Sequence, residues 1–479
     1  MNRRRFLSDS AGLAAAAMGR HLPGGTGAVP SANKQVRVRV DPGRVLGRIP
    51  DDFTGLGYEI SSVATPGLLT AKNRTYVQLV RTLGARGVIR VGGNTSDYSS
   101  FAPHADAVSS PKATVVNEAS LQDLGTFLDA TGWKLIWGLN LGGGNEQNAI
   151  EEAQAVMAAA KDKLLAFEIG NEPDLFGGRG TAHRAAGYDY QDYLKEYRRY
   201  KAAIRARLPT APFAGPDAAS ATEWVTRFAA DEGKDLKLLT HHYYRECASP
   251  RSTLDKLLNT DPKLRPELEK LRAASAAARV PYRICETNSF CGGGKPGVSD
   301  TFGAALWVLD YMFTLAWADA AGVNMETGVN QLGFISSYSP IGDNEHGMYS
   351  AKPEYYGMLA FGQASRGRRV GADWDASGMN LKAYPVLGDN NRLWLTLINK
   401  EVARDAEVSI TVTTPFSSAS VCRLTAPSVE SATEVTLAGS PVTSDGHWRP
   451  AHRERARIEQ NVCDIHVPAA SAALLTFEG

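Results

Sequence analysis

Cysteine is scarce and scattered in this chain, which excludes several kinds of site. The 479 residues include five cysteines, none in a CxxC pair, and nine histidines without HExxH spacing. A zinc or redox motif is therefore unsupported, and we expect no metal and no cofactor. If the chain is exported, the disulfide to test is Cys422–Cys463, within the C-terminal domain.

The chain also lacks an excess of charge of either sign. It has 52 Lys and Arg residues against 51 Asp and Glu residues, a net charge of +1. Such a balance gives no overall attraction for nucleic acid or an anionic membrane, so we expect neither as a partner. The one basic run, Trp448 to Arg457, is interpreted as a solvated turn, with a polyanion site as the alternative.

Long apolar runs are also missing after the N-terminus. The most apolar stretch, residues 304–323, contains Asp310 and Asp319 and predicts a buried helix instead of a membrane span. Residues 1–32 carry RRRFL at positions 3–7 before an Ala- and Gly-rich stretch. They resemble a bacterial twin-arginine export signal, which predicts a periplasmic or secreted protein. A basic first helix is the alternative.

Short apolar runs alternate with helical patterns over residues 49–372. The predicted strands are Phe53–Glu59, Gly87–Val91, Lys134–Leu139, Leu164–Ile169, Pro212–Gly215, Leu236–His242, Pro281–Cys285 and Gly322–Met325. The predicted helices are Thr75–Gly84, Leu121–Thr131, Asn148–Ala160, Gln191–Leu208, Glu223–Ala230, Pro266–Ala278, Thr301–Ala320 and Glu354–Gln363. Eight strand–helix units predict an α/β fold, a (β/α)₈ TIM barrel.

The pattern changes in residues 373–479. Period-two alternation without helical windows, as in Leu393–Asn399, predicts an antiparallel β-sandwich domain. The early alternating run QVRVRV, within residues 33–48, has no role in the barrel, and we expect it to join this sandwich. The small domain would then be built from both ends of the chain.

Two glutamates stand where predicted barrel strands end. Glu172 follows strand four in the run EIGNEPDLF, and Glu286 ends strand seven in PYRICETNSF. Catalytic groups of barrels lie at these strand ends, and burial raises the pKa of a carboxyl group there. Two facing carboxylates suit glycoside hydrolysis, in which one protonates the leaving oxygen and the other attacks carbon or activates water. The alternative is a rim glutamate paired with an arginine.

Asn-Glu-Pro after strand four and a second Glu after strand seven resemble clan A of the glycoside hydrolases. Within the clan the chain is similar to family 79, the heparanase and β-glucuronidase family. The matching runs are IRVGGNTSDY (89–98), EIGNEPDLF (168–176), THHYY (240–244) and ETNSFCGGG (286–294). The resemblance covers nearly the whole mature chain and is nearest to a bacterial β-glucuronidase.

The resemblance implies a role for each matching residue. Glu172 would be the general acid/base, Glu286 the nucleophile, and Asn171 the partner of the sugar 2-hydroxyl. His241 and Tyr243 would point inward, with the Tyr243 hydroxyl on Glu286. Carboxyl groups ~5–5.5 Å apart would accompany this retaining mechanism.

Further positions concern the uronic acid. Gly292 and Gly293 would offer amides to its carboxylate, because consecutive glycines let N–H groups approach an anion. Tyr338 would donate to the same carboxylate. Glu59 and Asn94 match positions that bind sugar hydroxyls, although the animal heparanases carry Asp and Thr there. Cys291 stands in place of an aromatic residue, which leaves a looser loop or a reactive thiol as possibilities.

The sequence therefore predicts a retaining glycoside hydrolase that releases glucuronic acid, or a close uronic acid, from β-glucuronides. Its partner would be a carbohydrate substrate, and a monomer is assumed. The alternatives are an endo-β-glucuronidase of heparanase type on a uronic-acid polymer, a clan A enzyme for a neutral sugar, and a non-catalytic carbohydrate-binding barrel.

Overall fold

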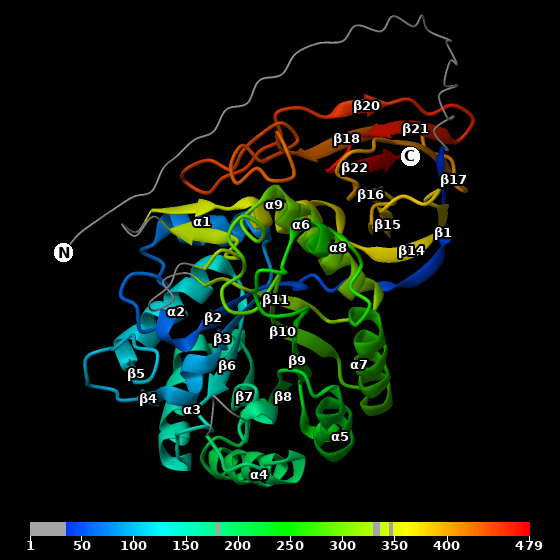
Figure 1. Ribbon diagram of the computed structural model, residues 1–479. Helices are drawn as coiled ribbons and strands as arrows, with labels where there is room; N and C mark the ends of the chain where they lie inside the picture. Colours follow the sequence, from blue (N-terminus) through cyan, green and yellow to red (C-terminus); the bar gives the residue numbers. More distant parts are fainter. Residues whose placement is uncertain (1–34, 179–182, 329–335, 344–347) are drawn as a thin grey trace, which may run out of the picture. The chain divides into compact units, whose positions relative to one another are not determined.

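The computed structural model describes residues 35–178, 183–328, 336–343 and 348–479; the predicted export signal lies outside them. Eight parallel strands form the predicted barrel (Figure 1). They are β2 (Thr54–Glu59), β3 (Val88–Gly92), β6 (Lys134–Leu139), β7 (Leu164–Ile169), β8 (Ala214–Ala218), β9 (Leu238–Tyr244), β10 (Tyr282–Asn288) and β11 (Val323–Glu326). Their hydrogen-bonded order is β7-β6-β3-β2-β11-β10-β9-β8, and a parallel bridge between Phe167 and Phe213 joins the two end strands.

Helices surround the barrel, and each predicted helix has a counterpart. The α-helices are α1 (Arg74–Leu83), α2 (Glu118–Thr131), α3 (Glu146–Ala160), α4 (Tyr190–Arg207), α5 (Thr222–Glu232), α6 (Leu254–Leu258), α7 (Leu264–Ala278), α8 (Phe302–Trp317) and α9 (Pro353–Ala364). The 3₁₀ turns are η1 (Ile60–Ser62), η2 (Asn94–Tyr98), η3 (Lys161–Lys163), η4 (Pro173–Leu175) and η5 (Gly233–Asp235). Side chains of Asn73, Asn117, Asn145 and Asp189 accept backbone N–H groups where α1 to α4 begin, which stabilises those helix starts.

The side chains of the barrel strands divide between an inner and an outer core. On β9, Leu238 belongs to an inner cluster with Val88 and Ala214. Its neighbour Leu239 belongs to the large cluster that joins the strands to the surrounding helices. Even-numbered residues at the start of β9 therefore face inward and odd-numbered ones outward.

The C-terminal domain is a ten-stranded, mostly antiparallel sheet. Its strands are β1 (Val36–Arg48), β14 (Arg368–Asp375), β15 (Leu381–Leu387), β16 (Leu393–Asn399), β17 (Ala406–Val412), β18 (Ser418–Thr425), β19 (Thr436–Leu437), β20 (Glu454–Ala456), β21 (Val462–Val467) and β22 (Ser471–Glu478). One core contains Val38 and Ile410 together with Leu395 and Leu475, so the sheet closes over itself as a β-sandwich.

The N-terminal strand belongs to this sandwich, as predicted. β1 pairs antiparallel with β14 and parallel with β17. The exact domain boundaries at residues 48/49 and 372/373 stay predictions. Two small sheets lie elsewhere in the chain: β4 (Ser99–Phe101) with β5 (Thr114–Val116), and β12 (Ile341–Asp343) with β13 (Tyr349–Ala351).

A buried ion pair joins the barrel to the sandwich. Asp310 of α8 accepts hydrogen bonds from Lys400 Nζ at 2.5 Å and from the Tyr384 hydroxyl at 2.6 Å. The Tyr384 ring stacks on Phe313, with ring centroids 4.8 Å apart. The apolar stretch around Asp310 is thus a packed helix, as predicted. Among the residues described, no helix is long and apolar enough to cross a membrane.

Candidate active site

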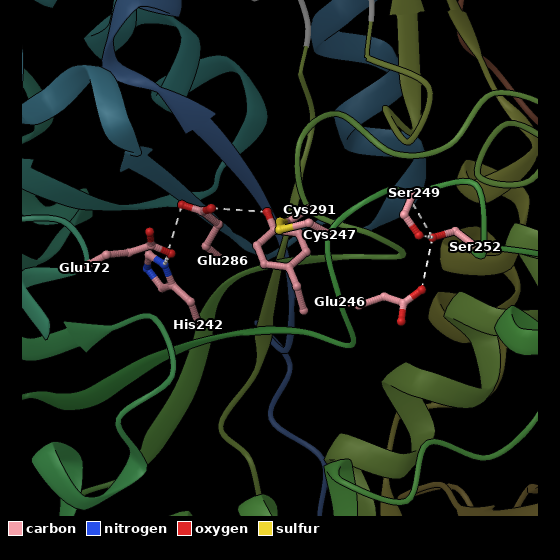
Figure 2. Close-up of a disulfide and its surroundings, with 9 residues drawn as sticks. Glu172, His242, Glu246, Cys247, Ser249, Ser252, Glu286 and Cys291 are labelled. Carbon is pink, nitrogen blue, oxygen red and sulfur yellow. Dashed lines mark hydrogen bonds and ion pairs between the residues drawn. A yellow bond between two sulfur atoms is a disulfide. The ribbon is translucent and has the colours of Figure 1, made fainter. Parts of the chain in front are cut away.

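The structure brings Glu172 and Glu286 together at the carboxyl ends of their strands. One carboxylate oxygen of each lies within 4.8 Å of the other, and the side chains are 17% and 12% exposed. Figure 2 shows both carboxylates beside the ring of His242. Retaining glycosidases hold their carboxyl groups ~5–5.5 Å apart, whereas inverting enzymes need ~6.5–9.5 Å to admit a water molecule. The spacing suits direct attack on carbon.

The backbone of Glu172 is held in the left-handed region, with φ 52° and ψ 50°. For a residue with a side chain this conformation costs about 1–3 kcal/mol and persists only where the surroundings enforce it. Here the N–H of Glu172 donates to the Asp217 carbonyl at 3.0 Å, and Pro173 begins η4. Burial raises the pKa of Glu172, and a hydrogen bond from His242 opposes that rise.

His242 connects Glu172 to a buried aspartate. Its Nδ1 lies 3.0 Å from Glu172 Oε1, and its Nε2 lies 2.8 Å from Asp217 Oδ1. Burial acts to lower the pKa of His242, but the charges of Asp217 and Glu286 outweigh burial and raise that pKa well above its ordinary value. A protonated ring donates from both nitrogens, so His242 orients the Glu172 carboxyl group.

Arg90 of β3 is fully buried behind both glutamates. Its guanidinium group donates to Glu168 Oε2 at 3.2 Å, Glu286 Oε2 at 2.9 Å, Asp217 Oδ2 at 2.5 Å and Asn171 Oδ1 at 2.8 Å. Arg90 therefore holds Glu286 through Oε2, while Oε1 accepts a hydrogen bond from the Tyr244 hydroxyl. We call the ionisable group of six the mouth network: Arg90, Glu168, Glu172, Asp217, His242 and Glu286.

Carboxyl groups outnumber cations in the mouth network, and their pKa values diverge accordingly. Burial opposes the ionisation of Asp217, but Arg90 and His242 outweigh it and lower the Asp217 pKa. For Glu168, burial and the Asp217 charge raise the pKa to about 7. Asp217 is thus the permanent anion of the network, whereas Glu168 retains a proton more readily.

The two tyrosines of the THHYY run have the opposite orientation to the one predicted. The Tyr244 hydroxyl donates to Glu286 Oε1 at 3.1 Å, whereas the Tyr243 hydroxyl donates to Asp261 at 2.6 Å, on the outer side of the barrel. His241 likewise lies outside, with Nε2 3.7 Å from Glu267. The predicted inward placement of His241 and Tyr243 is wrong, because alternation separates the two sets but leaves open which set faces inward.

Glu59, Asn94 and Asn171 lie around the same mouth. Glu59 accepts hydrogen bonds from the Thr95 N–H at 2.7 Å and hydroxyl at 2.6 Å, and from the Asn94 N–H at 3.2 Å. Burial raises the pKa of Glu59 to about 7, although Thr95 opposes that rise. The Asn94 side chain is exposed. Asn171 is fixed between Arg90 and the Asp97 carboxylate, which accepts its N–H at 3.0 Å.

The glycine run follows Glu286 in the loop after β10. Gly292, Gly293 and Gly294 have φ values of 77°, 86° and 81°, a conformation that residues with a Cβ rarely adopt. The Gly293 carbonyl accepts the Ser337 N–H at 2.6 Å and the Tyr338 N–H at 3.4 Å. The predicted residues Gly292, Gly293 and Tyr338 therefore share one loop cluster, and the Tyr338 side chain is buried.

The disulfide in the structure is not the predicted pair, Cys422 and Cys463. Cys291 is bonded to Cys247, in the loop after β9, and neither is a reactive thiol. Cys422 and Cys463 are free and buried. They cannot pair because Cys422 packs in the core shared with the barrel, whereas Cys463 packs inside the sandwich.

Comparison with known proteins agrees with this geometry. The family description "Glycosyl hydrolase family 79 C-terminal beta domain" matches residues 383–474. A β-glucuronidase of Aspergillus niger is 26% identical over 394 residues, covering 75% of this chain and 69% of that protein. A β-glucuronidase of Neurospora crassa is 27% identical over 378 residues, covering 69% of this chain and 66% of that protein. The resemblance to glycoside hydrolase family 79 is confirmed.

A solved structure supports the fold over a longer span. A 4-O-α-L-rhamnosyl-β-D-glucuronidase from Fusarium oxysporum 12S superposes with a TM-score of 0.77 at 20% identity, covering 91% of this chain and 100% of that one. The match includes both the barrel and the sandwich. The shared fold therefore extends beyond the C-terminal segment that the family description matches.

Four members of the mouth network are absent from the predicted site: Arg90, Glu168, Asp217 and His242. A signal for two of them is present in the sequence, because a charged residue inside an apolar strand must find a partner. Arg90 interrupts VIRVGG and Glu168 interrupts LLAFEIG. Their common partner Asp217 comes from β8, and only the closed barrel brings all three strands together.

Two groups of described side chains have donor atoms close enough to hold a metal ion: Glu168, Asp217 and Cys285, and Glu172, His242 and Glu286. In the first group the cation is Arg90, and burial raises the pKa of the Cys285 thiol well above its ordinary value. In the second, the raised pKa of His242 favours protonated ring nitrogens, which have no lone pair to offer. These donor sets suit internal ion pairing.

Proposed function

We propose that this chain is a retaining β-glucuronidase that releases glucuronic acid, or a close uronic acid, from β-glycosides by double displacement. The observation that carries the proposal is the Glu172–Glu286 pair, with carboxylate oxygens within 4.8 Å at two strand ends. The two fungal relatives are both named β-glucuronidase, which supports a glucuronide as the substrate.

In the first step, protonated Glu172 donates its proton to the glycosidic oxygen while a Glu286 oxygen attacks the anomeric carbon. The bond between carbon and the leaving oxygen breaks, the aglycone leaves as an alcohol, and an ester joins the sugar to Glu286. The raised pKa of Glu172 supports the acid role because it keeps the proton available. Tyr244 and Arg90 hold Glu286 as it attacks.

In the second step, Glu172 is a carboxylate and accepts a proton from a water molecule. The water oxygen attacks the anomeric carbon from the face that the aglycone left, and the ester bond to Glu286 breaks. Two inversions retain the configuration. His242 supports this step because its hydrogen bond stabilises the ionised form of Glu172.

The remaining predicted residues would bind the sugar. Gly292 and Gly293 would donate backbone N–H groups to the uronate carboxylate, with Tyr338 as a third donor. Asn171 would contact the 2-hydroxyl, and Glu59 and Asn94 further hydroxyls. A carboxylate recognised by several neutral donors distinguishes a glucuronide from a glucoside by charge-assisted hydrogen bonds.

We also propose that the protein is exported, with residues 1–32 as its leader. The Cys247–Cys291 disulfide supports this proposal, because disulfides persist chiefly in oxidising compartments.

The test is a comparison of initial rates on p-nitrophenyl β-glucuronide and p-nitrophenyl β-glucoside with wild type, Glu286→Gln and Glu172→Gln. We expect the wild type to prefer the glucuronide and Glu286→Gln to lose about 10³-fold or more in kcat. The released sugar, followed by NMR, should first appear as the β anomer. Glu172→Gln should keep substrate binding while it loses turnover.

Three other outcomes would each favour a different function. Preference for the glucoside would remove the uronate-binding role of Gly292 and Gly293. Cleavage of a uronic-acid polymer alone would favour an endo-acting enzyme. Binding of sugar without turnover by the folded wild type would favour a carbohydrate-binding barrel.

A further inference from the structure

The loops after β9 and β10 are tied together beside the catalytic pair. Cys247 and Cys291 form a disulfide across 44 residues of sequence. Backbone hydrogen bonds flank it: the Cys291 N–H donates to the Glu246 carbonyl at 3.0 Å, and the Ala248 N–H donates to the Cys291 carbonyl at 3.1 Å. Figure 2 shows this bridge between the Glu172–His242–Glu286 group and the loop that carries Ser249 and Ser252.

The Cys247 side of the bridge is itself anchored. The Glu246 carboxylate accepts hydrogen bonds from Lys256 Nζ at 2.9 and 3.0 Å and from the Ser252 hydroxyl at 3.0 Å. Arg245 donates to the Asn259 carbonyl at 2.9 Å. These contacts join the loop to α6, so Cys247 is a fixed point to which Cys291 is attached.

The Cys291 side is intrinsically loose. Three successive glycines follow Cys291, and glycine has the widest choice of backbone conformation and loses the most entropy when it is ordered. A Cβ at Gly292 would have no atom within 4 Å, so packing does not hold that residue. The covalent bridge fixes the segment before the glycines, and the Ser337 N–H, which donates to the Gly293 carbonyl, fixes the middle of the run.

We propose that the Cys247–Cys291 disulfide is a positioning element for substrate specificity, which holds the Gly292 and Gly293 amides in place for the uronate carboxylate. The inference rests on the proposed function and deepens it. The disulfide touches no reacting atom, and Glu286 is separately held by Arg90 and Tyr244. Loss of the bridge therefore weakens recognition of the carboxylate and leaves the chemical step in place.

The experiment compares the full-length oxidised wild type with the double variant C247S/C291S on the glucuronide and the glucoside. We expect KM for the glucuronide to rise about tenfold, as for loss of a charge-assisted hydrogen bond, with kcat nearly unchanged. The kinetic constants for the glucoside should stay the same. The matched control is Cys422→Ala, which removes a free buried cysteine of the sandwich and should leave the ratio of kcat/KM between substrates unaltered.

A second arm avoids any folding defect of the double variant. Dithiothreitol reduces the bridge of the folded wild type: the disulfide takes up two electrons and two protons, giving two thiols, while the reagent becomes a cyclic disulfide. Loss of the bridge is checked by thiol titration, and the same tenfold rise in KM is expected. Removal of the reductant and reoxidation should restore the original KM.

Different results would overturn the proposed function and the positioning role of the disulfide. A wild type without preference for the glucuronide overturns the proposed function before any variant is compared. A wild type that prefers the glucuronide, and keeps that preference with the bridge reduced or replaced, overturns the positioning role. An equal loss of kcat on both substrates would also overturn it, because a general structural defect does not distinguish a carboxylate from a hydroxymethyl group.

Discussion

Two buried groups of charged side chains in this chain differ in their balance of cations and carboxyl groups. At the contact between barrel and sandwich, Asp310 has one cation, Lys400, and one hydroxyl donor, Tyr384. Burial opposes ionisation of Asp310, but Lys400 outweighs it, and the pKa of Asp310 is lowered. Every charge has its partner, which is the arrangement under which a buried ion pair is tolerated.

The mouth network has two cations for four carboxyl groups. Because cations are too few, some of these carboxyl groups keep their protons more readily: the pKa of Glu168 is raised to about 7, and that of Glu172 is also raised. An ion pair that only stabilises the fold needs no proton on its carboxyl group, whereas an acid/base catalyst needs a carboxyl group that can hold one. The difference separates a structural ion pair from the proposed catalytic group within a single chain.

The largest effect should come from removing the central cation of each group. Arg90→Met removes the guanidinium group that donates to the buried carboxylates of Glu168, Asp217 and Glu286, so we expect a loss of about 3–5 kcal/mol in the free energy of unfolding. We also expect kcat to fall about 10²–10³-fold because Glu286 loses a charged donor. Lys400→Met should cost a similar free energy while the folded protein keeps its kcat/KM. Urea unfolding and initial rates on the glucuronide measure the two quantities.

If Lys400→Met lowers kcat/KM as much as Arg90→Met, the two groups do not differ in their effect on activity and the distinction between them is contradicted. Rates must be corrected for the folded fraction, which circular dichroism provides at the assay temperature. An Arg90→Met protein with full activity would remove the mouth network from the mechanism.

A smaller effect should separate the inner and outer faces of β9. Tyr244→Phe removes the hydroxyl that donates to Glu286, and we expect kcat/KM to fall about 10- to 100-fold, the value of one hydrogen bond to a charged group. Tyr243→Phe removes the hydrogen bond to Asp261 instead. It should cost about 1 kcal/mol of stability and leave the rates unchanged. Reversed results would restore the orientation inferred from the sequence.

Much of the fold was readable from the sequence because each barrel strand is a short apolar run with a helical pattern behind it. The two glutamates were readable for the same reason: a strand that ends in Asn-Glu-Pro places its carboxylate at the rim. The orientation of β9 was not readable. Both Leu238 and Leu239 are buried, one inside the barrel and one under the helices, so neither face is marked by polarity.

The disulfide could not be predicted from the sequence for a similar reason. Cys247 and Cys291 are distant in sequence and follow different strands, and only the parallel pairing of β9 with β10 brings their loops together. Cys422 and Cys463 are separated by almost the same length of sequence, 41 residues against 44, but pack in different cores. The presence of two cysteines in one domain is therefore a poor guide to pairing when a sheet has two buried faces.

The smallest effect concerns pH, and it tests whether His242 controls the proton on Glu172. Glu172 must be protonated to act as the acid, so kcat/KM falls as pH rises through its pKa. His242 opposes the upward shift that burial imposes on this pKa. His242→Gln should therefore raise the Glu172 pKa further and move the alkaline limb of the kcat/KM profile to higher pH. Profiles of initial rate on the glucuronide measure the position of that limb.

The matched control is His241→Gln, the adjacent residue on the outer face of β9. Its ring lies near Glu267, on the outer face of the strand and away from Glu172 and Glu286, so the alkaline limb should stay where it is in the wild type. A limb that moves to lower pH in His242→Gln would mean that His242 acts on Glu172 by some route other than its charge. A limb that moves equally in both variants would assign the shift to the strand as a whole, because substituting either face would then disturb β9 in the same way.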